Sequence, residues 1–352
     1  MDRREFLKST GAVAATSAIG TAVSAADGAP AAPAISKQLR ELRLALPWME
    51  SAAGPADWAR RLSRDVTSLS DGRLRLTPMF GVASSLATVR AGDADLHFGD
   101  ITDDAKAHRA FAYFSGLPGD HGMAPQHLQA WLQVGGGQEL WDDLAADLGI
   151  KPLLAAHTGT RSFLLAAERI ETMGALSGRR VRVHGLACDV ARGLGLEPAE
   201  LPPAEIAGSM RRGDVLAAEC GGAIVSYALG LRTAAPYAAG ASMNGRGRAL
   251  ALCVRRKLWD DMDASSQAIL AAAAATEFHA SLAEEEAHRP FLHARAPQDR
   301  TWPIAAELAH AIQRIADAVV AHAAGTDAPA ARISTSYAAF KRATHQEQHA
   351  IS

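Results

Sequence analysis

Hydrophobic positions follow two different spacings along the chain, and each change of spacing predicts a new element. Residues 42–48 (LRLALPW) alternate with a period of two, which predicts a strand. A helix follows, with apolar residues on one face: Trp58, Leu62, Val66 and Leu69. Residues 73–79 and 94–99 predict two further strands, separated by a short helix that Ser84 caps. Strands that alternate with helices indicate a parallel sheet.

The same order of elements returns in the second half of the chain. Residues 181–185 (VRVHG) and 215–219 (VLAAE) predict strands, with two helices between them. Two segments also resemble each other: VRAGDADL (89–96) and MRRGDVLA (210–217) both place an arginine and Gly-Asp between a helix end and an apolar strand. We therefore predict an α/β protein with two similar lobes.

A long helix is predicted after a strand near residue 250 (ALALCV). Residues from Ser265 to about His288 all tolerate a helix, and at about 1.5 Å per residue this run is long enough to lie along both lobes. The predicted organisation has six parts: a signal peptide (1–26), a linker (27–38), lobe I (39–158 with 248–264), lobe II (159–247 with 291–305), the long interlobe helix (265–289) and C-terminal helices (306–352).

The N-terminal segment is typical of an export signal. Arg3 and Arg4 precede a weakly hydrophobic run from Thr10 to Val23. This run is shorter than the roughly 20 apolar residues of a membrane-spanning helix. Small residues before a cleavage point near Ala25 or Ala26 complete the pattern. The paired arginines predict the twin-arginine route, which delivers folded proteins to the periplasm.

Composition narrows the class of ligand. The chain has 36 basic and 38 acidic residues, a formal net charge of -2, and no basic block, so it has no electrostatic footprint for nucleic acid or anionic lipid. The composition leaves a small neutral or anionic molecule as the expected class of ligand. Cys188, Cys220 and Cys253 lie more than about 30 residues apart, which fits neither a metal motif nor a disulfide framework, although one bridge stays open.

Local motifs give catalysis little support. The glycines at 135–137 lack the spacing of a phosphate loop, and close packing is the favoured interpretation. HQEQH at 345–349 has two imidazoles four residues apart but no third ligand, so a polar tail is favoured over a metal site. The sequence contains neither a G-x-S-x-G elbow nor an H-E-x-x-H helix.

Polar residues gather where predicted strands end, which is where open α/β sheets bind ligands. Arg182 lies within one such strand, Glu219 and Asp100 close two others, and His157 and Arg161 follow a fourth. If the lobes face each other, these side chains converge on a cleft. An arginine there can offer a planar pair of donors to a carboxylate.

Four segments resemble the extracytoplasmic solute-binding subunits of TRAP transporters, and most of all the branch that binds 2-oxo monocarboxylates: GRLRLTPMFG, QAWLQVGGGQELWDDLAADLGIKPL, LSGRRVRVHG and EIAGSMRRGDVLAAE. The similarity runs from about residue 42 to residue 340. It implies a periplasmic-binding-protein fold whose two lobes, joined by crossing strands and a long helix, close around an organic acid and deliver it to membrane subunits. It does not imply an enzyme, and it leaves a homodimer open.

The resemblance also assigns roles to residues. Arg182 corresponds to the arginine that anchors the substrate carboxylate, and Glu219 to a glutamate that helps to hold a cation beside the acid. We expect the binding site to comprise Arg182, Arg161, Glu219, Cys220, His157, Trp48, Thr102 and Gly245.

Several positions depart from the family pattern. Arg161 replaces a glutamine, Cys220 replaces a tryptophan, and Met243 and Gly245 replace a tryptophan and a glutamate; residues 101–103 replace an aromatic run. We hypothesise that the Arg161 guanidinium pairs with Glu219 in place of the cation, because two positive charges would repel each other there. No cofactor would then be required. The alternative is that Arg161 points away and the pocket is merely degenerate; a cation at Glu219 stays possible, although Arg161 disfavours it.

Two other functions stay open from the sequence. An exported enzyme would use Glu219, His157 and Cys220 as acid, base or nucleophile, although no local motif supports it. A sensory binding module that has lost transport would account for the altered pocket.

Overall fold

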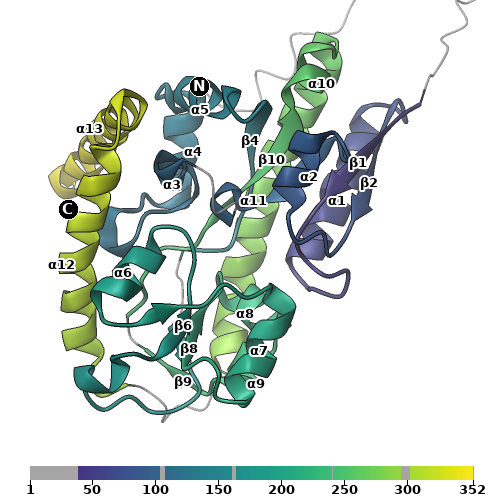
Figure 1. Ribbon diagram of the computed structural model, residues 1–352. Helices are drawn as coiled ribbons and strands as arrows, with labels where there is room; N and C mark the ends of the chain where they lie inside the picture. The colour runs from purple at the N-terminus through teal and green to yellow at the C-terminus, as the bar shows by residue number, and fades with distance from the viewer. Residues whose placement is uncertain (1–38, 104–107, 161–163, 240, 295–301, 352) are drawn as a thin grey trace, which may run out of the picture. The chain divides into compact units, whose positions relative to one another are not determined.

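The computed structural model describes residues 39–103, 108–160, 164–239, 241–294 and 302–351 (Figure 1). The predicted signal peptide and linker lie outside these ranges. Two five-stranded sheets form the framework. The first has the order β2-β1-β3-β10-β4, with these bounds: β1 (Arg40–Ala45), β2 (Leu74–Met79), β3 (Leu96–Gly99), β4 (Ile150–His157) and β10 (Ala249–Arg255).

The first sheet is parallel only in part. β1 pairs with β2 and β3 in parallel, as the alternation of strands and helices predicts. β10 is antiparallel to both β3 and β4. It enters the sheet after the chain has passed through the second sheet, so it runs back in the opposite direction. The short pattern ALALCV contains no information about that direction.

Helices cover the first sheet. In α1 (Pro55–Leu69) the predicted apolar face is buried at Trp58, Leu62 and Val66, whereas Leu69, the last residue, is 53% exposed. Ser84 precedes α2 (Ser85–Ala91), but its side chain makes no capping hydrogen bond, so this detail of the prediction is wrong. The remaining elements of this region are η2 (Ile101–Asp103), η3 (Arg109–Phe111), α3 (Ala112–Ser115), η4 (Gly119–His121), α4 (Pro125–Gln133), α5 (Gly137–Ala146) and α10 (Arg256–Asp260).

Two of the three consecutive glycines, Gly135 and Gly137, serve close packing, as expected, whereas a Cβ at Gly136 would meet no atom within 4 Å. A Cβ at Gly135 would lie 2.8 Å from the ring of Phe340, and one at Gly137 would lie 2.7 Å from the ring of Trp131. Trp131 in turn stacks on Phe114 at 5.3 Å between ring centroids. Any side chain at Gly135 or Gly137 would displace these aromatic rings, so the segment is part of the core.

The second sheet has the order β7-β6-β8-β5-β9, and its strands are short: β5 (Leu164–Ala166), β6 (Arg180–Arg182), β7 (Glu197–Pro198), β8 (Ala217–Glu219) and β9 (Tyr237–Ala238). β6 is parallel to β7 and β8. Its helical elements are η5 (Met173–Leu176), α6 (Ala187–Gly193), α7 (Pro203–Arg211), α8 (Ala223–Ala228) and α9 (Leu231–Ala234). Two α/β lobes, as predicted, are therefore present.

The long helix α11 (Ala264–Ala294) contacts β4 of the first sheet and α8 beside the second (Figure 1). It does not stop before Pro290, where we expected it to end, but includes that residue. Pro290 lies at an exposed end of the helix, where water can bind the carbonyl that loses its helical partner. Two further helices complete the chain, α12 (Ala305–Ala324) and α13 (Ala328–Ile351).

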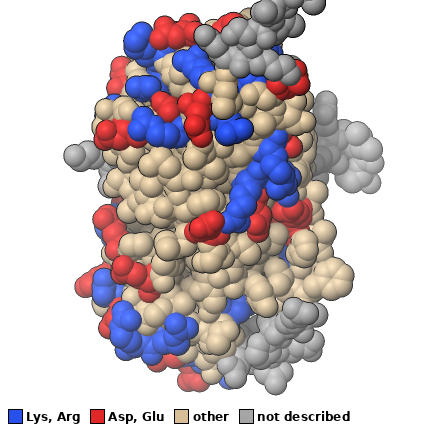
Figure 2. Space-filling view, turned by 90° about the vertical axis from the view of Figure 1, so that its right-hand side faces the viewer, with Lys and Arg blue, Asp and Glu red and all other residues tan. Residues whose placement is uncertain are grey.

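Charges are mixed over the surface. Figure 2 shows basic and acidic side chains intermingled on one face, around a broad area of uncharged residues. That face has no field of a single sign, in keeping with the even composition. Within the described ranges, none of the helices has the length and apolar character needed to span a bilayer.

Candidate functional site

Arg182 and Glu219 lie side by side at the ends of neighbouring strands. Arg182 is the last residue of β6 and Glu219 the last residue of β8, and the register pairs Arg182 with Ala218. The two strands are parallel, so both side chains come from the carboxyl edge of the second sheet, where ligands bind in open α/β folds. The structure thus places both predicted residues at the same edge of this sheet.

The contacts of Arg182 with its described neighbours are long. Its side chain is buried, with 7% exposed, yet its contacts with described residues are long: Nη1 lies 3.4 Å from His184 Nδ1 and 3.7 Å from Cys220 Sγ. A guanidinium has five N–H donors in one plane. Among the described residues, no carboxylate pairs with it at salt-bridge distance.

Glu219 serves the backbone of a loop. It is fully buried, and its two oxygens accept separate hydrogen bonds, Oε2 from the Met243 N–H at 2.7 Å and Oε1 from the Asn244 N–H at 2.9 Å. Arg161, which we expected to pair with Glu219, lies outside the described residues. The hypothesis of an Arg161–Glu219 pair therefore stays a prediction.

A second buried arginine, which the sequence did not reveal, organises the edge of the first sheet. The Arg248 side chain is 2% exposed, and its Nε donates to Asp100 Oδ2 at 2.6 Å. Nη2 donates to Ser115 Oγ at 3.1 Å and to Thr102 Oγ1, and Nη1 donates to Asn244 Oδ1 at 3.1 Å. Thr102, a predicted site residue, is thus held by Arg248.

His157 is a neutral side chain of the core. It is the last residue of β4, its Nδ1 accepts the Gly159 N–H at 3.1 Å, and its ring meets the Phe278 ring edge-on. Burial, together with the positive charges of Arg248 and Arg246, lowers the pKa of His157 to about 3. His157 is therefore uncharged at neutral pH and offers no charge to a ligand.

Of the other predicted site residues, Trp48 and Cys220 are buried and Gly245 is half-buried. Trp48 and Cys220 belong to one apolar cluster that includes residues of both lobes. Trp48 Nε1 has no acceptor among the described atoms. Gly245 has φ +59°, and a Cβ there would lie 2.0 Å from the Gly119 carbonyl oxygen, so Gly245 permits a close approach of two backbone segments. Cys188, Cys220 and Cys253 are not joined in a disulfide.

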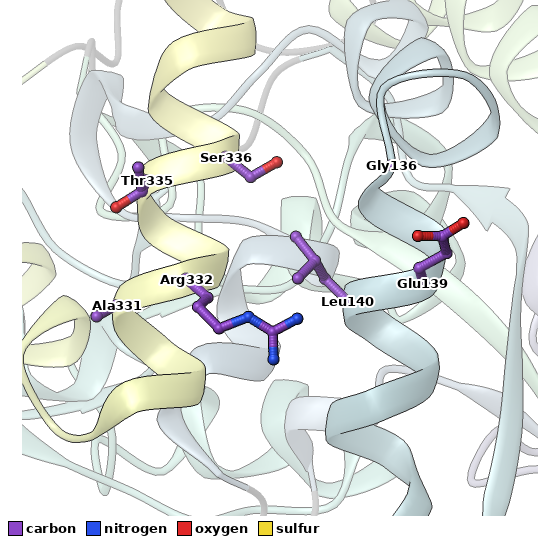
Figure 3. Close-up of a pocket in the computed structure, with 7 residues that line it drawn as sticks. All are labelled: Gly136, Glu139, Leu140, Ala331, Arg332, Thr335 and Ser336. Atoms are coloured by element: carbon purple, nitrogen blue, oxygen red, sulfur yellow. The ribbon is translucent and has the colours of Figure 1, made fainter.

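An open groove of about 580 Å³ lies elsewhere, between α5 and α13. Figure 3 shows Leu140 and Arg332 pointing into the space between these helices, whereas Glu139 points away from α13. Arg332 pairs with Asp143 at 3.4 Å, and both side chains are well exposed. The residues that line this groove include no buried charged side chain. We therefore place the candidate site at Arg182.

The side chains around Glu219 do not resemble a cation site. In the ranges that the structure describes, no three His, Cys, Asp or Glu side chains come together to hold a metal ion. Glu219 already accepts two backbone N–H groups. A hard cation prefers several oxygen ligands, and this donor set provides one carboxylate.

Comparison with known proteins identifies the family. The sequence pattern of the family "Bacterial extracellular solute-binding protein, family 7" matches residues 123–318, which is more than half of the chain. The monocarboxylate 2-oxoacid-binding periplasmic protein of Nostoc sp. is 26% identical over 242 residues, which span 67% of this chain and 65% of that protein. The match therefore covers slightly less than two thirds of this relative's length.

Solved structures show the same fold. A TRAP transporter solute-binding protein from Bordetella bronchiseptica, a dimer with copurified calcium and picolinate bound at one site, has a TM-score of 0.81 and 21% identity, covering 89% of this chain and 94% of that one. One from Pseudoalteromonas atlantica with sodium and pyruvate has a TM-score of 0.80 and 23% identity, covering 88% and 95%.

These findings confirm the resemblance to TRAP solute-binding subunits and the two-lobe fold. They also decide against the exported enzyme, since the family consists of binding proteins. The chain belongs to family 7 of the bacterial extracellular solute-binding proteins.

Proposed function

We propose that this protein captures a small organic acid, most specifically a 2-oxo monocarboxylate, and delivers it to the membrane subunits of a TRAP-type transporter. The observation that carries the proposal is the buried guanidinium of Arg182 at the carboxyl edge of β6, whose described contacts are long. A carboxylate would supply the paired, charge-assisted bonds that this side chain lacks.

The magnitude of such bonds is sufficient for recognition. Hydrogen bonds to charged groups contribute about 1.5–3 kcal/mol each, so two of them account for roughly a hundredfold or more in affinity. Removal of a charge from water requires a partner of opposite charge. An anion that fits between the lobes would therefore bind preferentially over its neutral analogues.

The relatives support the same class of ligand. The Nostoc protein is named for monocarboxylate 2-oxoacids, and the Pseudoalteromonas protein was crystallised with pyruvate. Picolinate, present in the Bordetella protein, is also a carboxylate with an acceptor atom on the neighbouring carbon. The shared feature is a carboxylate beside a second acceptor.

Isothermal titration calorimetry with pyruvate tests the proposal. We expect the protein to bind pyruvate and Arg182→Met to weaken binding by at least a hundredfold. Arg180 is the matched control, since it lies on the same strand but is exposed. Arg180→Met should bind like the unaltered protein. Equal affinity of Arg182→Met and the unaltered protein would contradict the assignment.

We further propose that binding needs no cation, unlike the relatives with sodium or calcium in their structures. The support is that both Glu219 oxygens already bind the backbone. Calorimetry in sodium-free buffer with EDTA, repeated after addition of sodium or calcium, should give the same affinity within about twofold. A large gain on addition of either ion would restore the cation site at Glu219.

The twin-arginine route and the membrane partners also belong to this proposal. Replacement of Arg3 and Arg4 by lysines should leave the protein in the cytoplasmic fraction of cells.

Co-purification with TRAP membrane subunits, tested with the ligand-bound protein, would support delivery to a transporter. A homodimer, as in the Bordetella structure, is tested by sedimentation.

A further inference from the structure

We infer that Asn244 determines specificity at the proposed acid site, by donating a hydrogen bond from its side-chain amide to an oxygen on the carbon next to the ligand carboxylate. This inference rests on the proposed function and adds a residue to it. None of the sequence patterns pointed to Asn244, which lies between two positions that depart from the family.

The orientation of the Asn244 amide is fixed by its neighbour. Asn244 Oδ1 accepts a hydrogen bond from Arg248 Nη1 at 3.1 Å. A guanidinium has donors only, so the oxygen of the amide must face Arg248 and the NH₂ group must face away from it. The assignment of oxygen and nitrogen therefore follows from the chemistry of the partner.

The NH₂ group of Asn244 is buried without an acceptor. The residue is 1% exposed, and Nδ2 has no hydrogen-bond partner among the described atoms. Buried polar groups in native proteins are nearly always paired, and an unpaired donor is unfavourable. An acceptor atom of a bound ligand would remove that cost.

Asn244 lies between the two ligand-facing edges. Its backbone N–H donates to Glu219, the residue that ends β8 beside β6 and Arg182. On its other side, Arg248 meets the loop after β6: a Cβ at Gly185 would lie 3.3 Å from both Nη atoms. Asn244 is thus linked directly to the end of β8 and, through Arg248, to the segments that follow β3 and β6. On these links we place its amide in the region of Arg182.

These positions specify the chemistry of the ligand. Arg182 would bind the carboxylate, and the Asn244 NH₂ group would bind a second acceptor a short distance away. A 2-oxo oxygen accepts hydrogen bonds and sits next to the carboxylate, whereas a simple aliphatic acid has no acceptor there. Loss of such a bond leaves the buried donor unpaired, so analogues without the oxygen should bind more weakly.

Pyruvate and propionate form the test pair, because they differ at the carbon next to the carboxylate. We expect the unaltered protein to bind pyruvate at least tenfold more tightly than propionate in calorimetry. The Asn244→Ala variant should bind pyruvate about tenfold more weakly than the unaltered protein does, whereas its affinity for propionate should change by less than about twofold. The preference for pyruvate would then disappear.

A second variant separates specificity from folding. Asn244→Asp keeps an oxygen for Arg248 but replaces the donor by an acceptor, so the preference for pyruvate should also vanish, with both acids weakened by the added negative charge. Thermal unfolding verifies that each variant is folded. An unchanged preference in either folded variant would overturn the inference, as would equal affinity of the unaltered protein for both acids. If the unaltered protein binds no carboxylate at all, the proposed function fails together with it.

Discussion

The two buried arginines of this protein, Arg248 and Arg182, occupy similar places and have opposite surroundings. Each lies at an edge where strands of one sheet end, and each is more than nine-tenths buried. Arg248 donates to four side chains, one of them the carboxylate of Asp100. Arg182 makes two long contacts with described side chains, one with an imidazole and one with a thiol.

This difference is the basis on which we assign a structural role to Arg248 and propose a binding role for Arg182. A buried ion is tolerated only with partners, and Arg248 finds them all within its own chain. Arg182 has no carboxylate at salt-bridge distance among the described residues, and for this reason we propose that a bound acid is its partner. Burial alone would give both residues the same role, whereas the count of hydrogen-bond partners distinguishes them.

The largest effect is expected from Arg248→Met. The substitution leaves Asp100 buried without its counter-charge, which typically costs about 3–5 kcal/mol. Urea unfolding at neutral pH should show a loss of this size in the free energy of unfolding. Asp100→Asn combined with Arg248→Met removes both charges and should recover part of that loss. If Arg248→Met alone were as stable as the unaltered protein, Arg248 would not be a structural charge and the contrast with Arg182 would be wrong.

Glu219→Gln tests the neighbour of Arg182. A glutamine can accept one of the two backbone N–H groups, but its own NH₂ must then face the other, and an unpaired or opposed donor costs about 1–3 kcal/mol. We expect a stability loss in that range by urea unfolding. If the function of Glu219 is instead to bind a cation, removal of its charge should leave the ligand-free protein equally stable or more stable.

The sequence predicted the local elements of this fold better than its long-range contacts. The buried face of α1 follows from helical spacing, and Arg182 and Glu219 follow from their positions at strand ends. Arg248 and Asp100 are 148 residues apart and meet because β10 returns beside β3. Neither periodicity nor composition contains that pairing, and Asn244 became visible only through its contact with Arg248.

Acid should reveal how tightly His157 is enclosed next to Arg248. The pKa of His157 is about 3 in the folded protein, below the value of about 6.5 in an unfolded chain. Between these values only the unfolded state binds the proton, so this residue makes stability fall as the pH falls from about 6.5 to about 3. The slope is at most about 1.4 kcal/mol per pH unit.

His157→Gln provides the control for that measurement, because a glutamine oxygen can still accept the Gly159 N–H but does not titrate. Urea unfolding at pH 7 and pH 5 should show a larger stability loss for the unaltered protein than for His157→Gln. Equal losses in the two proteins would mean that the imidazole is protonated in the folded state, and that the region around Arg248 is less enclosed than the structure indicates.

The smallest effect on stability is expected from Arg182→Met, and it sharpens the comparison most. This substitution removes a buried charge whose described contacts are long, so the free energy of unfolding should change by less than about 1 kcal/mol, or rise. Urea unfolding of Arg182→Met beside Arg248→Met makes the contrast direct. A loss above about 2 kcal/mol for Arg182→Met would reveal a strong partner within the protein itself, and Arg182 would then be a second structural arginine that leaves no charge for an acid.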